Sequence, residues 1–297
     1  MAARATRSAS RKARLTEAVA TGPLGALSHD ELGVIFDGLA DPLQPVVAVA
    51  LSSTCLGLRT PLQAALEVLK ERHARAVALC CKLGMSCAEV RDAEELIWSD
   101  EGLTADDAAT LGMLLHKWLP KLLELCLSRS GFSDAGVQAL CADLGPGAAP
   151  SLFLLSLGFN KFGPAGAEAL AAALRWGALP RLEMLWLSYN PIGSQGVIAL
   201  AMPLRKRPLL KEMRLVGCGI GDEGVASLVD NLGKDDFKAL EKLWLYTNEI
   251  TDTGVAKLSA VLDAGGIPRV TKLALGGTGA SYAAILSVQA ALKKRAQ

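Results

Sequence analysis

The chain has 297 residues, of which 51% are hydrophobic but only 5% aromatic, so its core must be built mainly from aliphatic side chains. Its 31 Lys and Arg residues are balanced by 30 Asp and Glu residues, which argues against a nucleic acid as the partner. No run of about 18 apolar residues is present, so we expect neither a transmembrane helix nor a membrane partner. The seven cysteines show no paired framework and predict free, buried thiols in a reducing compartment.

Residues 1–26 form a basic start, in which five basic residues precede the first acidic residue, Glu17. We expect a solvated, disordered tail. The alternatives are an Arg- and Ser-rich organelle transit peptide, or a nuclear-localisation or nucleic-acid-binding patch. The expected location is the cytoplasm or nucleus, with organelle import through the basic start as the alternative. The basic residues are Arg4, Arg7, Arg11, Lys12 and Arg14.

Residues 27–60 predict two short helices. The first has apolar residues at helical spacing, with Ser28 as its N-cap. Pro42 and Pro45 then interrupt the chain, and the apolar run 46–58 predicts the second helix. The apolar residues of the first helix are Leu32, Ile35, Phe36 and Leu39.

This segment resembles an F-box, whose pattern runs LPxELLxxIFxxL, then a short Pro-containing turn and an apolar helix that ends V-C-x-x-W-x-x-L. Ser28 stands where the family has Pro, and Cys55 replaces a large aromatic residue. The alternative interpretation is a helical cap that merely shields the first repeat. The resemblance implies docking of a Skp1-like subunit of a cullin ubiquitin ligase through Leu32, Ile35, Phe36 and Leu39.

Residues 61–92 are expected to form a linker helix and N-terminal cap, because residues 62–83 have amphipathic helical spacing. Four potential zinc ligands lie in this segment, but their spacing matches no paired zinc motif. We therefore predict no metal site. The four residues are His73, Cys80, Cys81 and Cys87.

Residues 93–297 repeat one pattern. Six clear units follow one another at intervals of 28 to 30 residues, and a weaker copy begins 29 residues before them at Ala93. Self-similarity at this period is the signature of a solenoid, in which each unit packs on its neighbours. The six clear units begin at Leu122, Leu152, Leu182, Leu210, Leu240 and Val270.

Each unit reads LxxLxLxxN-x-(I/F), followed by apolar residues at helical spacing. The LxL pair has a period of two and predicts a short strand with one buried face. Ser133, Thr251 and Thr104 are expected helix N-caps. The Asn after the strand is expected to bond backbone groups of neighbouring units that would otherwise lack partners. This Asn is residue Asn160, Asn190 or Asn248, and Ser130, Cys218 and Thr278 replace it in other units.

The units resemble leucine-rich repeats, and their period resembles that of the ribonuclease-inhibitor-like subclass. The alternation of strands and helices independently predicts right-handed crossovers and a parallel sheet. The expected fold class is therefore α/β. It is a leucine-rich-repeat horseshoe of seven β-α units, a right-handed solenoid with a parallel inner sheet, preceded by a small all-α N-terminal segment.

Common catalytic and nucleotide-binding motifs are missing from the sequence. The three histidines, His29, His73 and His116, lie in unrelated segments. We therefore expect no enzymatic activity, no catalytic residue and no cofactor.

The concave face is the candidate site, because the strand residues that flank the buried LxL pair point into the horseshoe. Two of the five Trp and two of the three Tyr fall on these strands, and Trp, Tyr and Arg dominate interface hot spots. The basic residues Arg214, Lys242 and Lys272 outnumber the nearby acidic residue, so an acidic or phosphorylated partner segment is favoured. The candidate partner-binding residues are Trp186, Tyr189, Arg214, Glu212, Trp244, Tyr246, Lys242 and Phe159.

These features predict a non-enzymatic protein–protein interaction module. With the F-box resemblance, it would be a substrate adaptor of a cullin-type ubiquitin ligase whose repeats bind the substrate. The alternative is a regulator or scaffold like the Ran GTPase-activating proteins and tropomodulins, which share the repeat type. An innate-immune-like receptor is a third class, but the sequence contains no nucleotide-binding module. The remaining tryptophans, Trp98, Trp118 and Trp176, are expected in the core.

Overall fold

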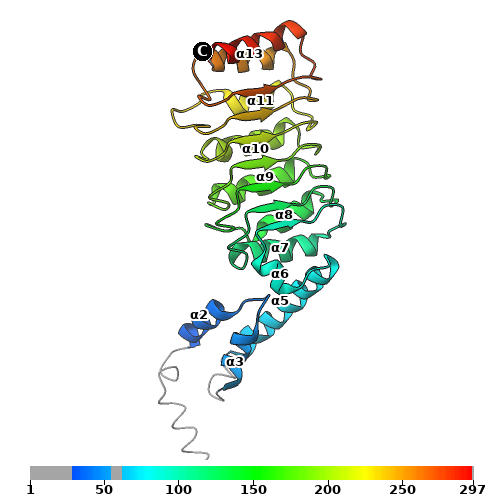
Figure 1. The fold of residues 1–297 in the computed structure, drawn as a ribbon, viewed down its shortest axis with the longest axis vertical. Coiled ribbons are helices and arrows are strands. Elements are labelled where there is room, and N and C mark those ends of the chain that lie inside the picture. Colours follow the sequence, from blue (N-terminus) through cyan, green and yellow to red (C-terminus); the bar gives the residue numbers. More distant parts are fainter. Residues whose placement is uncertain (1–28, 55–61, 296–297) are drawn as a thin grey trace, which may run out of the picture. The chain divides into compact units, whose positions relative to one another are not determined.

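The computed structural model describes residues 29–54 and 62–295 (Figure 1). Its contacts divide the chain into two compact units, Met1–Val90 and Arg91–Gln297. The basic start predicted for residues 1–26 and the end of the second predicted helix, residues 55–58, lie outside the described residues.

The first unit is helical. In the turn between its first two helices, Leu43 N donates a hydrogen bond to Asp41 Oδ1 at 2.8 Å. His73 Nδ1 contacts Pro42 O of the same turn at 2.6 Å, so this histidine has a structural role. Its helices are α2 (His29–Leu39), α3 (Val46–Thr54) and α5 (Gln63–Lys82), and α6 (Cys87–Asp92) continues across its boundary with the second unit. The first three share a core that contains Leu32, Phe36, Ala40, Ala48, Leu62 and Leu69.

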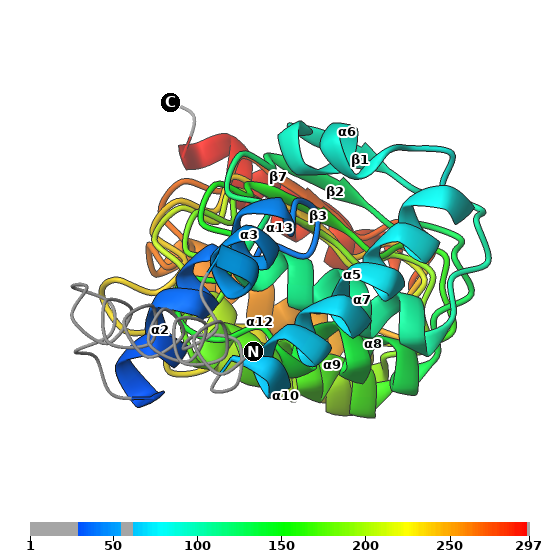
Figure 2. The same cartoon turned by 90° about the horizontal axis from the view of Figure 1, so that it is seen from below.

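The second unit alternates strands and helices. Its seven strands form one parallel sheet in chain order, so each β-α unit lies beside the next (Figure 1). Seen from below, helices α8, α9 and α10 gather on one side and strands β1, β2 and β3 on the other (Figure 2). This architecture confirms the predicted α/β solenoid of seven units. The strands are β1 (Glu95–Ile97), β2 (Glu124–Cys126), β3 (Leu154–Ser156), β4 (Met184–Trp186), β5 (Glu212–Arg214), β6 (Lys242–Trp244) and β7 (Lys272–Ala274). The helices are α7 (Ala105–Lys117), α8 (Asp134–Ala142), α9 (Pro164–Arg175), α10 (Gly193–Arg205), α11 (Asp222–Val229), α12 (Asp252–Asp263) and α13 (Tyr282–Arg295).

The LxL leucines build the core of the solenoid. Leu155 pairs in register with Leu185 of the next strand, and both are buried. Leu187, two residues further on, has no exposed surface, and its N–H donates to Arg214 O at 2.8 Å. A fully buried leucine contributes about 1.5–3 kcal/mol, so this repeated burial is the main source of stability.

The asparagine after the strand ties each unit to its neighbour. Asn248 Nδ2 donates to Leu215 O at 2.7 Å and to Leu245 O at 2.8 Å. Its Oδ1 accepts bonds from Cys218 N and Ile220 N of the preceding unit. The predicted role of the asparagines is therefore confirmed, because these buried groups would otherwise lack partners. Asn160 and Asn190 make equivalent bonds through Nδ2, and Ser130, Cys218 and Thr278 supply single donors where Asn is missing.

Aspartates join the helix starts of successive units. Asp222, the first residue of α11, accepts hydrogen bonds from Thr251 N and Gly254 N at the start of α12. A Cβ at Gly254 would overlap this carboxylate, and a Cβ at Gly166 would meet that of Asp134 in the same way. Thr104 and Thr251 cap their helices as predicted, whereas Ser133 occupies the N-cap without a side-chain bond.

Two burial predictions need correction. Trp98 is 3% exposed, as expected, but Trp176 is 72% exposed and the core prediction for it is wrong. It occupies the C-cap of α9, where the chain leaves the packed helix layer. The thiols of Cys80, Cys141 and Cys218 are free and buried, whereas Cys81 is exposed and Cys87 and Cys126 are partly exposed. None of the described helices is long and apolar enough to cross a membrane.

Candidate functional site

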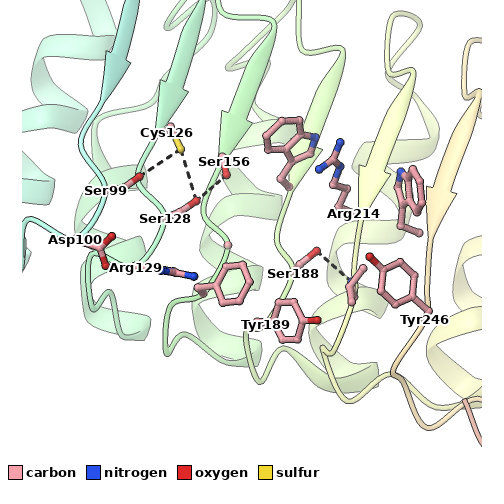
Figure 3. Close-up of a pocket in the computed structure, with 15 residues that line it drawn as sticks. Ser99, Asp100, Cys126, Ser128, Arg129, Ser156, Ser188, Tyr189, Arg214 and Tyr246 are labelled. Atoms are coloured by element: carbon pink, nitrogen blue, oxygen red, sulfur yellow. Dashed lines mark hydrogen bonds between the residues drawn. The ribbon is translucent and has the colours of Figure 1, made fainter. Parts of the chain in front are cut away.

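The helices of the second unit lie on one side of the sheet (Figure 2), and we term the other side the open face. Side chains alternate along a strand, so the residues beside each buried leucine point to this face. The register places Ser156 beside Trp186, Trp186 beside Arg214, and Arg214 beside Trp244. Figure 3 shows Ser156 and Arg214 on this face with their neighbours. Arg214 therefore stands between the two tryptophans.

A hollow of about 580 Å³ lies on the open face (Figure 3). Small buried residues form its floor, and larger aromatic side chains rise around it. This volume lies within the range of protein sites that accept a ligand or an inserted side chain. The floor consists of Ser156, Gly158, Ser188 and Val216, and the aromatic residues are Phe159, Trp186, Tyr189, Trp244 and Tyr246.

Glu212 anchors the aromatic side of the hollow, and its side chain is only 6% exposed. Its Oε1 accepts hydrogen bonds from Arg214 Nε at 2.6 Å and Trp244 Nε1 at 3.2 Å. Its Oε2 lies 3.4 Å from Lys242 Nζ. Burial opposes ionisation, but the hydrogen bonds and charges of Arg214 and Lys242 outweigh it and hold the pKa of Glu212 below its ordinary value of 4.5.

The cations beside Glu212 lie on the tryptophan rings. The Arg214 guanidinium carbon is 4.0 Å from the ring centre of Trp186 and 5.8 Å from that of Trp244. Lys272 Nζ lies 4.3 Å from the Trp244 ring centre, and Tyr246 meets that ring edge to face at 6.2 Å. Cation–π contacts of this kind contribute about 0.5–1 kcal/mol each at exposed sites. The aromatic surface is therefore held in place before any partner arrives.

A second aromatic row follows the strand ends. Phe159 and Tyr189 stack with ring centres 4.4 Å apart, and the guanidinium carbon of Arg129 lies 5.0 Å from the Phe159 ring centre. Both aromatic residues have positive φ, 56° and 57°, which costs a non-glycine residue about 1–2 kcal/mol. Their N–H groups donate to Ser188 O and Val216 O of the following units, which holds this conformation. The equivalent position has positive φ in every unit, from Asp100 to Gly277, so this conformation belongs to the repeat.

Gly217 makes room for the Tyr189 ring. Its φ of 61° suits glycine, and a Cβ there would lie 2.8 Å from Tyr189 Cδ1. The ring of Tyr189 therefore lies against Gly217 of the next unit, in space that a side chain there would need.

The opposite side of the hollow is polar. Ser128 Oγ lies 2.9 Å from Ser156 Oγ and 3.6 Å from Cys126 Sγ, which is 3.5 Å from Ser99 Oγ (Figure 3). Burial raises the pKa of the Cys126 thiol, but the hydroxyl hydrogen bonds outweigh this and leave it below the ordinary 9.0. Sequence reasoning missed this side because serine carries no hot-spot signature. The signal was positional, since Ser99, Asp100, Ser128 and Arg129 occupy the two places before the Asn position of their units.

Six of the eight predicted partner-binding residues line the hollow. Lys242 lies beside it, and the buried Glu212 supports its neighbours instead of facing a partner. Trp186 and Trp244 are only partly exposed, because Arg214 and Lys272 cover part of their rings. The six lining residues are Phe159, Trp186, Tyr189, Arg214, Trp244 and Tyr246.

The predicted docking stripe of α2 divides between two environments. Leu32 and Phe36 are buried in the core of the helical unit, whereas Ile35 and Leu39 are each 37% exposed. Any docking role therefore falls on the exposed pair. Within the described part of the chain, no group of three or more His, Cys, Asp or Glu side chains is placed to hold a metal ion.

A comparison with protein families identifies three of the repeats. A family model described as leucine-rich repeat matches residues 150–171, 182–201 and 208–229. Among solved structures, the chain resembles the actin-binding site 2 of leiomodin-1 at 14% identity and a TM-score of 0.38, over 48% of this chain and 78% of that one. It resembles an internalin (inlF) from Listeria monocytogenes str. 4b F2365 at 16% identity and a TM-score of 0.36, over 65% of this chain and 51% of that one. No curated protein sequence matches the chain.

The period, the parallel sheet and the family match lead to one conclusion about the fold. Solenoids of this kind present extended concave surfaces that bind other proteins. The chain contains leucine-rich repeats, and they form the seven-stranded α/β solenoid that carries the open face.

Proposed function

We propose that the chain is a non-enzymatic adaptor that captures a protein partner on the open face of its repeats. The aromatic hollow is the observation that carries this proposal. Tyr189 and Phe159 are 43% and 48% exposed on the open face, and aromatic residues are concentrated in interface hot spots. A large aromatic side chain buries about 150–250 Å² when fully covered, and less than half of Phe159 and Tyr189 is still exposed, so the aromatic residues supply the central part of the ~800 Å² that a standard interface takes from one partner.

The second half of the proposal concerns α2 and α3, which would dock a Skp1-like subunit of a cullin-type ubiquitin ligase. These helices expose apolar side chains that their own core does not use. Val34 is 74% exposed, Val46 is 68% exposed and Val47 is 54% exposed, beside the 37% of Ile35 and Leu39. An apolar surface of this kind on a small helical unit favours an interaction site. The repeat period supports placing the repeats in the ribonuclease-inhibitor-like subclass.

Affinity purification of the full-length chain followed by mass spectrometry tests the adaptor role. A Skp1-like protein and a cullin should be captured together with a substrate. The variant Val34→Asp/Val47→Asp should lose the Skp1-like protein and keep the substrate, whereas Tyr189→Ser/Tyr246→Ser should do the reverse. Val68→Asp, on the 47% exposed Val68 of α5, is the matched control and should change neither. If purified Skp1-like protein fails to bind the full-length chain, the ubiquitin-ligase role is wrong.

The alternative is a leucine-rich-repeat regulator or scaffold without a ubiquitin-ligase role, like the Ran GTPase-activating proteins and tropomodulins. The departures from the F-box pattern at Ser28 and Cys55 favour it. It would use the same open face. Capture of a GTPase or a cytoskeletal protein, with neither a Skp1-like protein nor a cullin, would select it.

A further inference from the structure

Charge is sorted along the open face. At one end of the sheet, Glu95 of β1 pairs in register with Glu124 of β2. At the other end, Lys242 of β6 pairs in register with Lys272 of β7. In the same row of positions, Leu154, Met184 and the buried Glu212 occupy the three strands between these ends. The side chains at the two ends of this row are therefore acidic at β1 and β2 and basic at β6 and β7.

The side chains around this row keep the same polarity. Asp100 adds a third carboxylate at the β1–β2 end, where Arg129 is the one opposing cation among the described residues of that row and the turns after it. At the other end Arg214 adds a third cation, and the buried Glu212 pairs with Arg214 and Lys242, so this end keeps an excess of positive charge. Glu94 lies one residue before β1, and Glu241 lies one residue before β6. Each end therefore gains one negative charge, and the difference in charge between the two ends is unchanged.

This inference rests on the proposed binding role of the open face. We propose that a partner protein binds there through a dipolar segment, which is basic at one end and acidic at the other. Basic residues of this segment lie over β1 and β2, an apolar side chain enters the hollow, and acidic residues lie over β6 and β7. A uniformly acidic or phosphorylated segment fits less well, because Glu95 and Glu124 would repel one of its ends.

The dimensions of the sheet set the spacing of the charges in the partner. Neighbouring strands lie about 4.8 Å apart, so the centres of the two charged ends are about 24 Å apart. An extended chain crosses that distance in about seven residues, and a helix needs about 16. The hollow extends from the β1 unit to the β6 unit, and its aromatic side chains come from the units of β3, β4 and β6, between Ser156 and Tyr246 (Figure 3). The apolar anchor of the partner therefore belongs near the middle of the segment.

Three capped peptides of about 11 residues with a central Phe test the proposal by calorimetry with the full-length chain, at low salt. One carries two Lys near one end and two Glu near the other, one carries four Glu, and one carries four Lys. The dipolar peptide should bind roughly tenfold more tightly than either of the others. Its affinity should fall as salt is raised, because the contacts are at an exposed surface.

Charge reversal of the protein gives the sharper test. The variant Glu95→Lys/Glu124→Lys reverses the acidic end, and Lys242→Gln/Lys272→Glu reverses the basic end. Each variant alone should lower the affinity for the dipolar peptide roughly fivefold to tenfold. The two combined should regain most of the lost affinity, because the same peptide can then lie in the opposite direction. Glu168→Lys, on the exposed side of α9, is the control and should leave the affinity within about twofold.

Tightest binding by the acidic peptide, or a combined variant that regains no affinity, would overturn the dipolar assignment. Binding of none of the three peptides at about 1 mM would overturn it as well. The proposed function fails separately. Tyr189→Ser/Tyr246→Ser should abolish capture of the partner whatever the charge pattern of that partner. If this variant loses the partner while charge reversal has no effect, the open face remains the binding site and only the dipolar assignment is rejected.

Discussion

Replacement of Glu212 with alanine should destabilise the repeats by about 2 kcal/mol. The change removes the acceptor of two hydrogen bonds, from Arg214 Nε and Trp244 Nε1, and the counter-charge of Lys242. Hydrogen bonds to charged groups contribute about 1.5–3 kcal/mol each. The Arg214 and Lys242 side chains are 41% and 46% exposed, so water can replace part of what they lose, and the net cost falls toward the lower value. A domain of this size should then melt about 4–8 °C lower.

Thermal and urea unfolding of the full-length chain measure this change. Glu124→Ala is the matched control, because Glu124 takes the same strand position in β2 and makes no ion pair among the described residues. It should cost less than about 0.5 kcal/mol. Glu212→Gln isolates the charge. Since the folded pKa of Glu212 is lowered, the advantage of wild type over this variant is present above pH 4.5 and is lost as the pH falls through the folded pKa. Equal costs for Glu212→Ala and Glu124→Ala would refute the anchoring role.

Three further predictions concern the stability of the repeats, measured by urea unfolding. Leu187→Ala should cost about 2–5 kcal/mol, because the side chain is fully buried, and a cost below about 1 kcal/mol would contradict the register. Asn248→Ala should cost about 1–3 kcal/mol more than Asn190→Ala, because Oδ1 of Asn248 accepts two hydrogen bonds and Oδ1 of Asn190 accepts none among the described residues. Equal costs would contradict the role of these two hydrogen bonds. Gly217→Ala should cost more than Gly131→Ala, since both have positive φ but only at Gly217 would a Cβ meet another side chain, and the reverse order would reject the fit to the tyrosine ring.

The sequence allowed the fold and the rows of the open face to be predicted, because both depend on local periodicity. The LxL pair and the helical spacing of each unit determine which face of each strand is buried, and Leu185 and Leu187 lie on that face. The constant period then aligns equivalent positions of successive strands, which is why Trp186, Arg214 and Trp244 could be placed side by side.

The contacts of the site depend on how far side chains reach across units, and this was not predictable. Glu212 stands two residues before Arg214, so the sequence favours an exposed ion pair, whereas the structure buries the carboxylate against Trp244 of the next strand. Asp222 suits the start of its own helix, yet it caps the following helix at Thr251. The polar side of the hollow carries residue types with no distinctive pattern.

The affinity of the full-length chain for its captured partner, measured for two double variants, tests the central claim most directly. Tyr189→Ser/Tyr246→Ser removes aromatic side chains that are 43% and 36% exposed at the hollow, and Trp176→Ser/Tyr282→Ser removes more exposed ones, at 72% and 76%, from helices. The first variant should bind about 100-fold more weakly while its melting temperature stays within a few degrees, and the second should bind like wild type. Unchanged affinity of the first variant, with loss of affinity in the second, would contradict binding at the open face.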